Sequence, residues 1–251
     1  MQPLSHGNIR LAATVVLLRD TVGGPEVFMT KRPGGAVFPD LHVFPGGKVD
    51  EADFAPEVLA GLEAGHADGL LGLAAGGLRY WVAAIRECFE ECGVLLAYRD
   101  GALVRWRDRA EMERFHDYRQ RLIDGELSMT ELCRHEGLRL AADRVFYFSH
   151  WITPEVAPKR FDTRFFVAAM PEAQQTVAHQ DEIVDDVWIR PADALSAHAA
   201  GDWQMIAPTL TTLSCIAAYP TTEHLLAAVR AESHLDCLTD SLRQQGMHEL
   251  R

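Results

Sequence analysis

One segment of the chain constrains its fold more than any other: residues 86–94, which read RECFEECGV. At roughly 100° per residue, Glu87, Glu90 and Glu91 share one arc of a helix. The opposite face of that helix is apolar and consists of Ile85, Cys88, Phe89, Cys92 and Leu96. Such a helix has to pack its apolar face on a core, and a chain of 251 residues with 48% hydrophobic residues can build one.

The three carboxylates carry the chemical information in this segment. Like charges three or four residues apart on a helix repel by about 0.2–0.5 kcal/mol per pair, and a bound divalent cation converts that repulsion into coordination. The alternative is the solvated face of an ordinary amphipathic helix. Upstream, Pro45, Gly46 and Gly47 follow a predicted strand, and glycine allows a backbone carbonyl to approach a metal closely. Together these features favour a metal site.

The charge balance limits the partners of the chain. It has 24 Lys and Arg residues against 36 Asp and Glu residues, a formal net charge of −12. A protein that coats a duplex needs a basic face, so no nucleic-acid partner is predicted. A small anionic substrate remains compatible with this charge, because a bound metal reverses the local field.

Cysteine usage and the termini predict a cytoplasmic protein that does not enter a membrane. The five cysteines are scattered without a C-x-x-C pair, which argues against a disulfide framework and a zinc knuckle. Cys88 and Cys92 are predicted to be core thiols. The first ten residues lack the pattern of a secretory signal, and no apolar stretch is long enough to span a bilayer.

Hydrophobic periodicity predicts alternating strands and helices. The expected strands are 11–19, 26–30, 42–44, 144–151, 163–170 and 184–190. The expected helices are 78–97, two pieces of 105–137, 191–200 and much of 206–250. The two pieces separate near Gly125, with Ser128 or Thr130 as N-cap, and Pro191 begins the next helix. The glycine-rich residues 54–77 predict an irregular helix and a loop. Without a repeat or a linker, residues 1–251 are predicted to form a single domain.

The order of the upstream glycines and the acidic segment matches a known motif, G-x5-E-x7-R-E-U-x-E-E-x-G-U, where U is aliphatic. Gly47 is followed after five residues by Asp53, where the motif has Glu. Residues 54–85 replace the seven-residue spacer. The second half is intact and comprises Arg86, Glu87, Glu90, Glu91, Gly93 and Val94, with Cys88 at the aliphatic position. The chain therefore resembles the Nudix hydrolase family.

The expanded spacer resembles one branch of that family, the coenzyme A and acyl-CoA diphosphatases. Segments 41–47, 84–96, 149–166 and 186–195 resemble the same branch in the same order. The resemblance implies an α/β/α sandwich with a mixed β-sheet, on one face of which the motif helix packs. In this arrangement residues 54–85 are a helical insertion and residues 206–251 a helical tail.

The resemblance also implies a set of metal ligands and catalytic groups. Mg²⁺ or Mn²⁺ would be held by the Gly46 carbonyl and by Glu87, Glu90 and Glu91, with Glu182 as an additional ligand or general base. Glu87 is the other candidate base, and Glu182 has the alternative of a surface acid in an acidic loop. Arg86 is expected to orient the glutamates by ion pairing, supported by Asp53.

Substrate phosphates are expected to meet basic side chains outside the motif. Arg160 and Arg164 have a spacing of two about Asp162 as a strand begins, so the three share one face. The alternative is that both arginines pair with Asp162. Lys31 and Arg32, after the second strand, are further candidates. His42 either reaches the site or packs as a hydrogen-bonded histidine, and Trp151 and Trp188 are expected in the core.

The implied reaction is metal-dependent hydrolysis of a pyrophosphate bond in coenzyme A or acyl-CoA, giving 3′,5′-ADP and a phosphopantetheine. ADP-ribose, NADH or another dinucleotide are alternative substrates, and a non-catalytic ligand-binding domain is a third reading. Another coenzyme A branch carries R-x3-G-x3-F-P-G-G, and this chain has Asp40 and Ala36 where that pattern requires Gly and Arg. Many family members are dimers, which leaves a homodimer open.

Overall fold

The computed structural model describes residues 9–32, 40–176 and 185–244, and its centre is a seven-stranded mixed sheet. Five strands follow the order β11 (Asp185–Ile189), β2 (Gly24–Lys31), β1 (Ile9–Thr21), β10 (Arg160–Ala169) and β9 (Val145–Ile152). Two short strands complete the sheet: β3 (His42–Val43) pairs with β2, and β4 (Gly46–Lys48) pairs with β1. Strands β1 and β10 are parallel, and the other neighbours are antiparallel.

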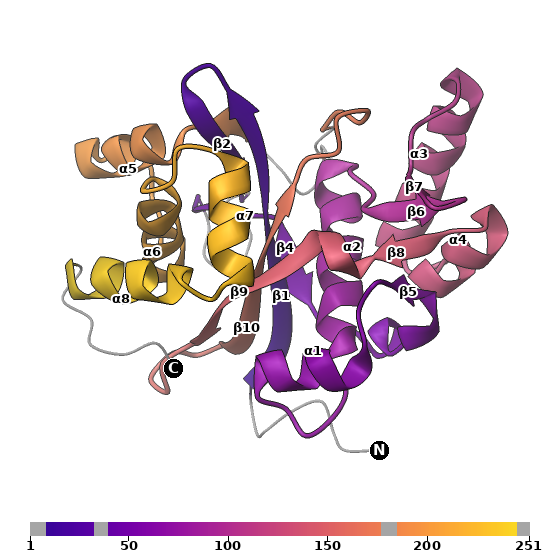
Figure 1. The fold of residues 1–251 in the computed structure, drawn as a ribbon, viewed down its shortest axis with the longest axis horizontal. Coiled ribbons are helices and arrows are strands. Elements are labelled where there is room, and N and C mark those ends of the chain that lie inside the picture. The colour runs from indigo at the N-terminus through magenta and orange to yellow at the C-terminus, as the bar shows by residue number, and fades with distance from the viewer. Residues whose placement is uncertain (1–8, 33–39, 177–184, 245–251) are drawn as a thin grey trace.

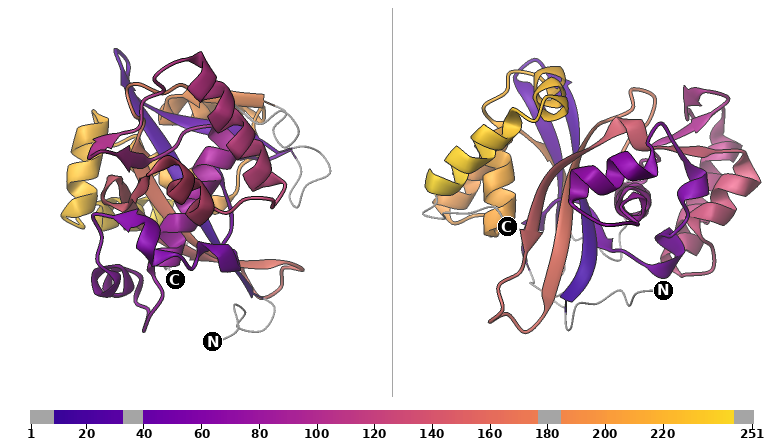
Figure 2. Two further views of the ribbon diagram at one scale, coloured as in Figure 1. Left: turned by 90° about the vertical axis from the view of Figure 1, so that its right-hand side faces the viewer. Right: turned by 60° about the horizontal axis from the view of Figure 1, so that its bottom comes forward.

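Helices cover both faces of this sheet (Figures 1 and 2). One face carries α1 (Ala64–Leu71) and α2 (Leu78–Cys92); the other carries α5 (Pro191–Ala200), α6 (Ala207–Ile216), α7 (Thr222–Arg230) and α8 (His234–Gln244). Successive side chains of β1 point to opposite faces of the sheet, which gives two hydrophobic cores. Val15 and Leu17 belong to the core under α2, while Val16 and Leu18 belong to the core under the C-terminal helices. The predicted α/β/α sandwich with a mixed sheet and a helical C-terminal region is confirmed.

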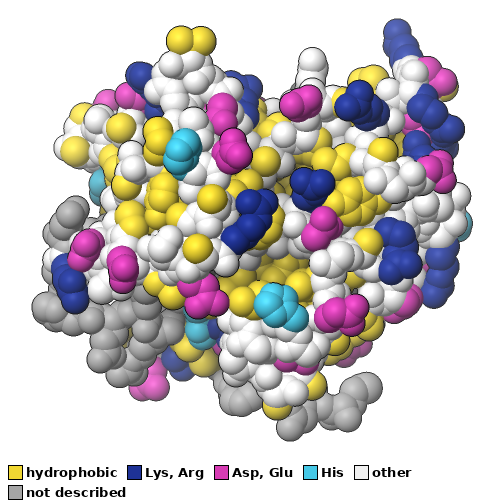
Figure 3. Space-filling view, viewed as in Figure 1, with side chains coloured by type: hydrophobic (Ala, Val, Ile, Leu, Met, Phe, Trp, Pro, Cys, Tyr) yellow, Lys and Arg dark blue, Asp and Glu magenta, His cyan; other side chains and the backbone are white. Residues whose placement is uncertain are grey.

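A second group of elements extends the α2 side. Its four-stranded sheet has the order β5 (Leu59–Ala60), β8 (Arg139–Ala141), β6 (Ala97–Arg99) and β7 (Ala102–Leu103). Helices α3 (Arg109–Ile123) and α4 (Met129–Glu136) lie between β7 and β8, and charged side chains are dense over this right-hand edge in Figure 3. The Ser128 hydroxyl accepts from the Glu131 N–H, which confirms Ser128 as the N-cap of α4.

Two predicted elements differ from the structure. The helix predicted at 78–97 ends at Cys92, because Gly93 takes a left-handed conformation (φ 71°) and donates to the Phe89 carbonyl at 2.9 Å. Residues 54–85 are only partly helical. They contain a 3₁₀ turn (Pro56–Val58), strand β5, helix α1 and the first turns of α2. Within the described residues, no helix combines the length and apolarity needed to cross a membrane.

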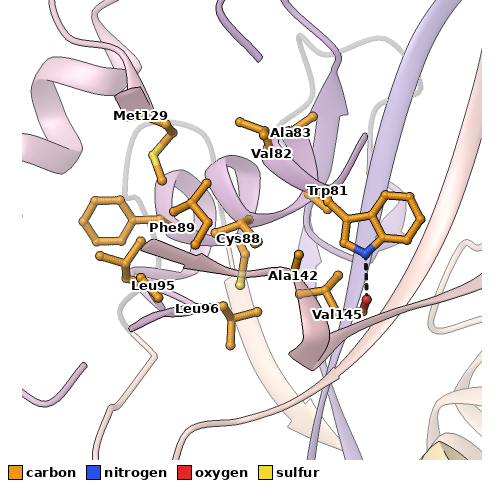
Figure 4. Packing of buried hydrophobic residues seen from close by; sticks show 14 of the residues in the cluster. Trp81, Val82, Ala83, Cys88, Phe89, Leu95, Leu96, Met129, Ala142 and Val145 are labelled. Atoms are coloured by element: carbon orange, nitrogen blue, oxygen red, sulfur yellow. Dashed lines mark hydrogen bonds between the residues drawn. The ribbon is translucent and has the colours of Figure 1, made fainter. Parts of the chain in front are cut away.

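The apolar side of α2 is anchored along its whole length. Figure 4 shows the Trp81 indole reaching β9, where its Nε1 donates to the Val145 carbonyl at 2.8 Å. Cys88 and Phe89 pack in the same cluster as Leu95 and Met129. Cys88 and Cys92 are both fully buried, as predicted for core thiols. The arc that carries the glutamates is thereby held in a fixed orientation toward β4.

Candidate active site

The glutamates of α2 lie against the glycines of β4. The Gly46 N–H donates to Glu91 Oε2 at 3.1 Å. A Cβ atom at Gly47 would lie 2.6 Å from the carboxyl carbon of Glu87, so a larger residue there would displace that side chain. The absence of a side chain at Gly47 therefore lets strand β4 approach the Glu87 carboxylate closely.

Arg86 joins the two halves of the motif. Its Nε and Nη2 donate to the two carboxylate oxygens of Asp53 at 2.9 Å each, and Nη2 also donates to the Lys48 carbonyl at 2.8 Å. Its Nη1 donates to Glu87 Oε1 at 2.8 Å and to Glu90 Oε2 at 3.0 Å. The predicted ion pairing of Arg86 with the glutamates is confirmed, and the shorter Asp53 reaches Arg86 as well.

This network has one cation for several anions. Burial alone would lower the pKa of Arg86, but its hydrogen bond with Asp53 and the charges of Glu87 and Glu90 raise it. Burial raises the pKa of Glu87 well above its ordinary value, and neighbouring Glu91 and Glu90 add to the rise against the opposing effect of Arg86. The pKa of Glu87 is thus set first by its burial and then by crowding with the neighbouring carboxylates.

The donor chemistry of the site fits Mg²⁺ or Mn²⁺, since crowded carboxylates beside a glycine turn supply hard oxygen ligands. In this arrangement Glu87 and Glu90 bond to Arg86, and Glu91 bonds to the Gly46 amide. Accordingly, the described part of the chain contains no group of three His, Cys, Asp or Glu side chains that already converges as a ligand set. The Gly46 carbonyl stays a predicted ligand, and Glu182 lies outside the described residues.

The predicted phosphate-binding residues occupy different environments. Arg164 is 4% exposed and pairs with Asp162 at 3.8 Å, which favours the ion-pair alternative for this residue. The Arg160 Nε donates to the Thr153 carbonyl at 3.0 Å. Lys31 ends β2, where its Nζ lies 3.8 Å from Asp40, and Arg32 follows it. Substrate contact by any of these four basic residues stays a prediction.

Two aromatic predictions are tested by the structure. His42 is buried and stacks on Trp203 with ring centroids 3.9 Å apart, so the packed alternative holds. Trp188 packs edge-on against Phe28, and Trp151 packs against the core beneath the C-terminal helices, as expected.

Sequence reasoning missed Arg119, which lies on α3. Its Nε donates to the Glu90 carbonyl at 2.9 Å, and the residue is 3% exposed. A signal was available, because Phe115, Arg119 and Leu122 follow helical spacing and form one buried stripe of α3. An arginine on the apolar stripe of a helix needs a buried partner, and the partner here is the Glu90 carbonyl of α2.

Comparison with known proteins identifies the family. A family model described as the NUDT19 Nudix domain matches residues 74–216, more than half of the chain. The chain belongs to the Nudix hydrolase family. The crystal structure of a NUDIX hydrolase from Alicyclobacillus acidocaldarius superimposes with a TM-score of 0.73 at 24% identity, covering 90% of this chain and 97% of that one, which supports the fold.

The relatives of this chain include proteins named acyl-coenzyme A diphosphatase NUDT19. The Gallus gallus protein is 27% identical over 207 residues, and the Homo sapiens protein is 24% identical over 213 residues. Each alignment covers 67% of this chain and 54% of the relative, so the chain spans about half the length of the relatives it matches. The predicted Nudix resemblance and the assignment as a hydrolase are confirmed.

Proposed function

We propose that this Nudix hydrolase cleaves the diphosphate of coenzyme A or acyl-CoA in the presence of Mg²⁺ or Mn²⁺, releasing 3′,5′-ADP and an (acyl-)phosphopantetheine. The observation that carries the reaction type is the excess of carboxylates around Arg86, held against the Gly46–Gly47 turn. The substrate is suggested by the expanded spacer and by the relatives named acyl-coenzyme A diphosphatase.

Hydrolysis of a diphosphate is slow because an attacking water meets clustered negative charge. A bound divalent cation shields that charge and lowers the pKa of a coordinated water. Glu87, Glu90, Glu91 and the Gly46 carbonyl are the groups that would hold it, with Glu182 as a further candidate. Arg86 keeps Glu87 and Glu90 in place, and Asp53 keeps Arg86 in place. Glu87 or Glu182 would take the proton of the attacking water.

One observation favours a second candidate, hydrolysis of ADP-ribose, NADH or another dinucleotide. The pattern R-x3-G-x3-F-P-G-G of another coenzyme A branch is absent, because Asp40 and Ala36 stand at its Gly and Arg positions. The same carboxylates and the same chemistry would serve this substrate class.

Product analysis by mass spectrometry tests the proposal. The purified protein is given coenzyme A, acyl-CoA, ADP-ribose and NADH separately, with Mg²⁺, with Mn²⁺ or with chelator, beside Glu91→Gln as inactive control. Phosphopantetheine that forms only with metal supports the proposal. Cleavage of ADP-ribose or NADH alone overturns the substrate and leaves the reaction type. Absence of any cleavage by the folded protein overturns both in favour of ligand binding without turnover.

A further inference from the structure

A cavity of about 510 Å³ lies directly beside the catalytic helix. One wall is the motif itself, with Asp50, Asp53, Arg86 and Glu90. The opposite wall is the turn that joins α3 to α4. The volume is within the range of about 300–1,000 Å³ that is usual for small-molecule sites. Because Glu90 lines the cavity, a substrate whose diphosphate lies at the glutamates would have this space next to it.

The charges of the cavity exclude one class of occupant. Asp50, Asp53 and Glu90 line the motif side, and Glu126 and Glu131 line the turn. The one lining cation, Arg86, already donates to Asp53, Glu87 and Glu90. A phosphate group placed here would meet several carboxylates and no free cation among the lining residues, which is unfavourable. The occupant is therefore not an anionic part of the substrate.

The remaining lining describes what the cavity accepts. Leu122, Leu127 and Met129 give the turn an apolar wall, while the carboxylates opposite are hydrogen-bond acceptors. A neutral chain that carries N–H and O–H donors along an otherwise apolar backbone matches both walls. The pantetheine arm of coenzyme A has this character, with two amide groups, a hydroxyl and no charge, whereas the 3′-phosphate-bearing nucleotide half does not.

We propose that the cavity between the motif and the α3–α4 turn binds the (acyl-)pantetheine arm of the substrate, and that this wall distinguishes coenzyme A from other diphosphates. The proposal rests on the proposed function, since it needs a substrate with such an arm. The diphosphate would then lie at the Glu90 edge of the cavity, and the nucleotide half would point away from it.

Ala52 offers a way to fill the cavity without disturbing the core, because it is exposed and yet lines the cavity. We expect Ala52→Trp to lower kcat/KM for coenzyme A at least tenfold. Competitive inhibition by pantetheine, which has no phosphate, is expected for the wild type and lost in the variant. Inhibition by 3′,5′-ADP should stay unchanged. Ala110→Trp, at an exposed position of α3 that does not line the cavity, is the matched control.

The outcomes separate this proposal from the proposed function. Failure of the wild type to cleave coenzyme A overturns the proposed function, and the cavity assignment with it. Cleavage of coenzyme A that Ala52→Trp leaves unchanged, or a wild type that pantetheine does not inhibit, overturns the cavity assignment alone. An equal loss of inhibition by pantetheine and by 3′,5′-ADP would also contradict it, since the cavity would then serve both halves of the substrate.

A second inference comes from a different observation, the contact between α3 and the end of α2. Helix α2 places Glu87, Glu90 and Glu91 near its C-terminus, where the helix dipole is negative, and its last turn has no basic residue of its own. The Arg119 side chain from α3 donates to the Glu90 carbonyl, one of those that no N–H of the helix can reach. Arg119 is 3% exposed, and its Nη2 has no hydrogen-bond partner among the described residues.

We infer that Arg119 is a positioning residue for the reaction: it supplies the missing cation at the C-terminus of α2 and fixes the turn that carries Glu90 and Glu91. The Arg119 Nη2 atom is buried on the same guanidinium group whose Nε donates to the Glu90 carbonyl. The contact would keep the two carboxylates at the separation that a cation requires, without contact between Arg119 and substrate.

Arg119→Met and Arg119→Lys test this role. We expect Arg119→Met to lower kcat tenfold or more and to raise the Mg²⁺ concentration for half-maximal activity several-fold, with little change in KM. Arg119→Lys, which keeps the charge, should recover much of the loss. Arg121→Met is the control, since Arg121 lies on the same helix and pairs only weakly with Asp117, at 3.9 Å. If Arg119→Met does not fold, Arg119→Gln, which also removes the charge, takes its place. A folded Arg119→Met or Arg119→Gln variant with normal kcat and Mg²⁺ dependence overturns the inference.

Discussion

Two arginine–carboxylate networks lie on the same side of the sheet and differ in their balance of charge. In the motif, Arg86 alone bonds to Asp53, Glu87 and Glu90, and Glu91 lies close by. The other network brings three arginines, from β6, the β7–α3 loop and α3, to two glutamates on α3 and α4. It consists of Arg99, Arg107, Arg114, Glu111 and Glu136, joined by contacts of 2.7–3.6 Å.

The pKa shifts follow the ratio of arginines to carboxylates in each network. Burial would raise the pKa of Glu111, but hydrogen bonds from Arg107 and Arg99 lower it to about 2. For Glu87 the same burial prevails, and the neighbouring carboxylates increase the rise. The chain's own arginines thus stabilise the charged form of Glu111, whereas burial and neighbouring carboxylates disfavour the charged form of Glu87. This difference is the reason for proposing the motif network, and not the Glu111–Glu136 network, as the site of catalysis.

The largest change in activity is expected when a carboxylate of the motif is neutralised. We expect Glu91→Gln to reduce hydrolysis on the order of 10³-fold, which corresponds to about 4 kcal/mol in the barrier. The stability of the fold should not decrease, because the change removes a repulsive charge and keeps an acceptor for the Gly46 N–H. Steady-state kinetics and urea denaturation of one preparation measure both. A variant that is destabilised and remains active would show that the motif is a structural network.

Removal of the Arg86 charge should lower the stability of the fold, unlike neutralisation of Glu91. We expect Arg86→Met to destabilise the fold by about 3 kcal/mol, because Asp53, 1% exposed, would lose its bidentate partner. Activity should be lost as well. Urea denaturation gives the free energy of unfolding, and Asp53→Asn combined with Arg86→Met tests the cause. The double variant should be less destabilised than Arg86→Met alone, and equal stability would contradict this account.

Neutralisation in the balanced network should cost stability and leave chemistry intact. We expect Glu111→Gln to reduce the free energy of unfolding by about 2 kcal/mol, since hydrogen bonds from two charged side chains are weakened. The kcat of the folded fraction should change less than twofold. Glu113→Gln, whose ion pair with Arg109 is exposed, is the control and should have almost no effect. A large fall in kcat for Glu111→Gln would remove the contrast between the networks.

Metal should act on one network only. Mg²⁺ at about ten times its dissociation constant should raise the free energy of unfolding by about 1.4 kcal/mol through binding to the folded state. Glu111→Gln should keep this increase and Glu91→Gln should lose most of it. Thermal unfolding with Mg²⁺ and with chelator measures the shift. An equal shift in both variants would place the cation elsewhere.

A fall in pH should mainly weaken the Glu111–Glu136 network. The folded pKa of Glu111 is about 2, below its ordinary value of 4.5. Its contribution to stability is therefore complete above pH 4.5 and is lost as the pH falls toward 2. We expect the stability difference between the wild type and Glu111→Gln to be constant from pH 5 to 7 and to shrink below pH 4.5. Urea titrations at each pH test this, and a difference that grows in acid would contradict the sign.

The sequence predicted those parts of the site that depend on local periodicity. The arc of Glu87, Glu90 and Glu91 and the N-cap at Ser128 follow from residues a few positions apart. The burial of Arg164 and the contact of Arg119 with Glu90 depend on packing between distant segments, which periodicity does not encode. The end of α2 was placed too late because the apolar run continues through Leu96, while Gly93 changes the chain direction.

The bond between Asp53 and Arg86 has a consequence for how this family can vary. Residues 54–77 leave the site and return through the start of α2 to the same place, so the chain forms a closed excursion whose ends are bonded to each other. Each doubling of such a loop costs only about 0.6 kcal/mol of closure entropy. Spacer length can therefore change at little cost in stability, provided that an acidic side chain and an arginine still meet at its two ends. The motif is best described by which residues meet, and the number of residues between them is secondary.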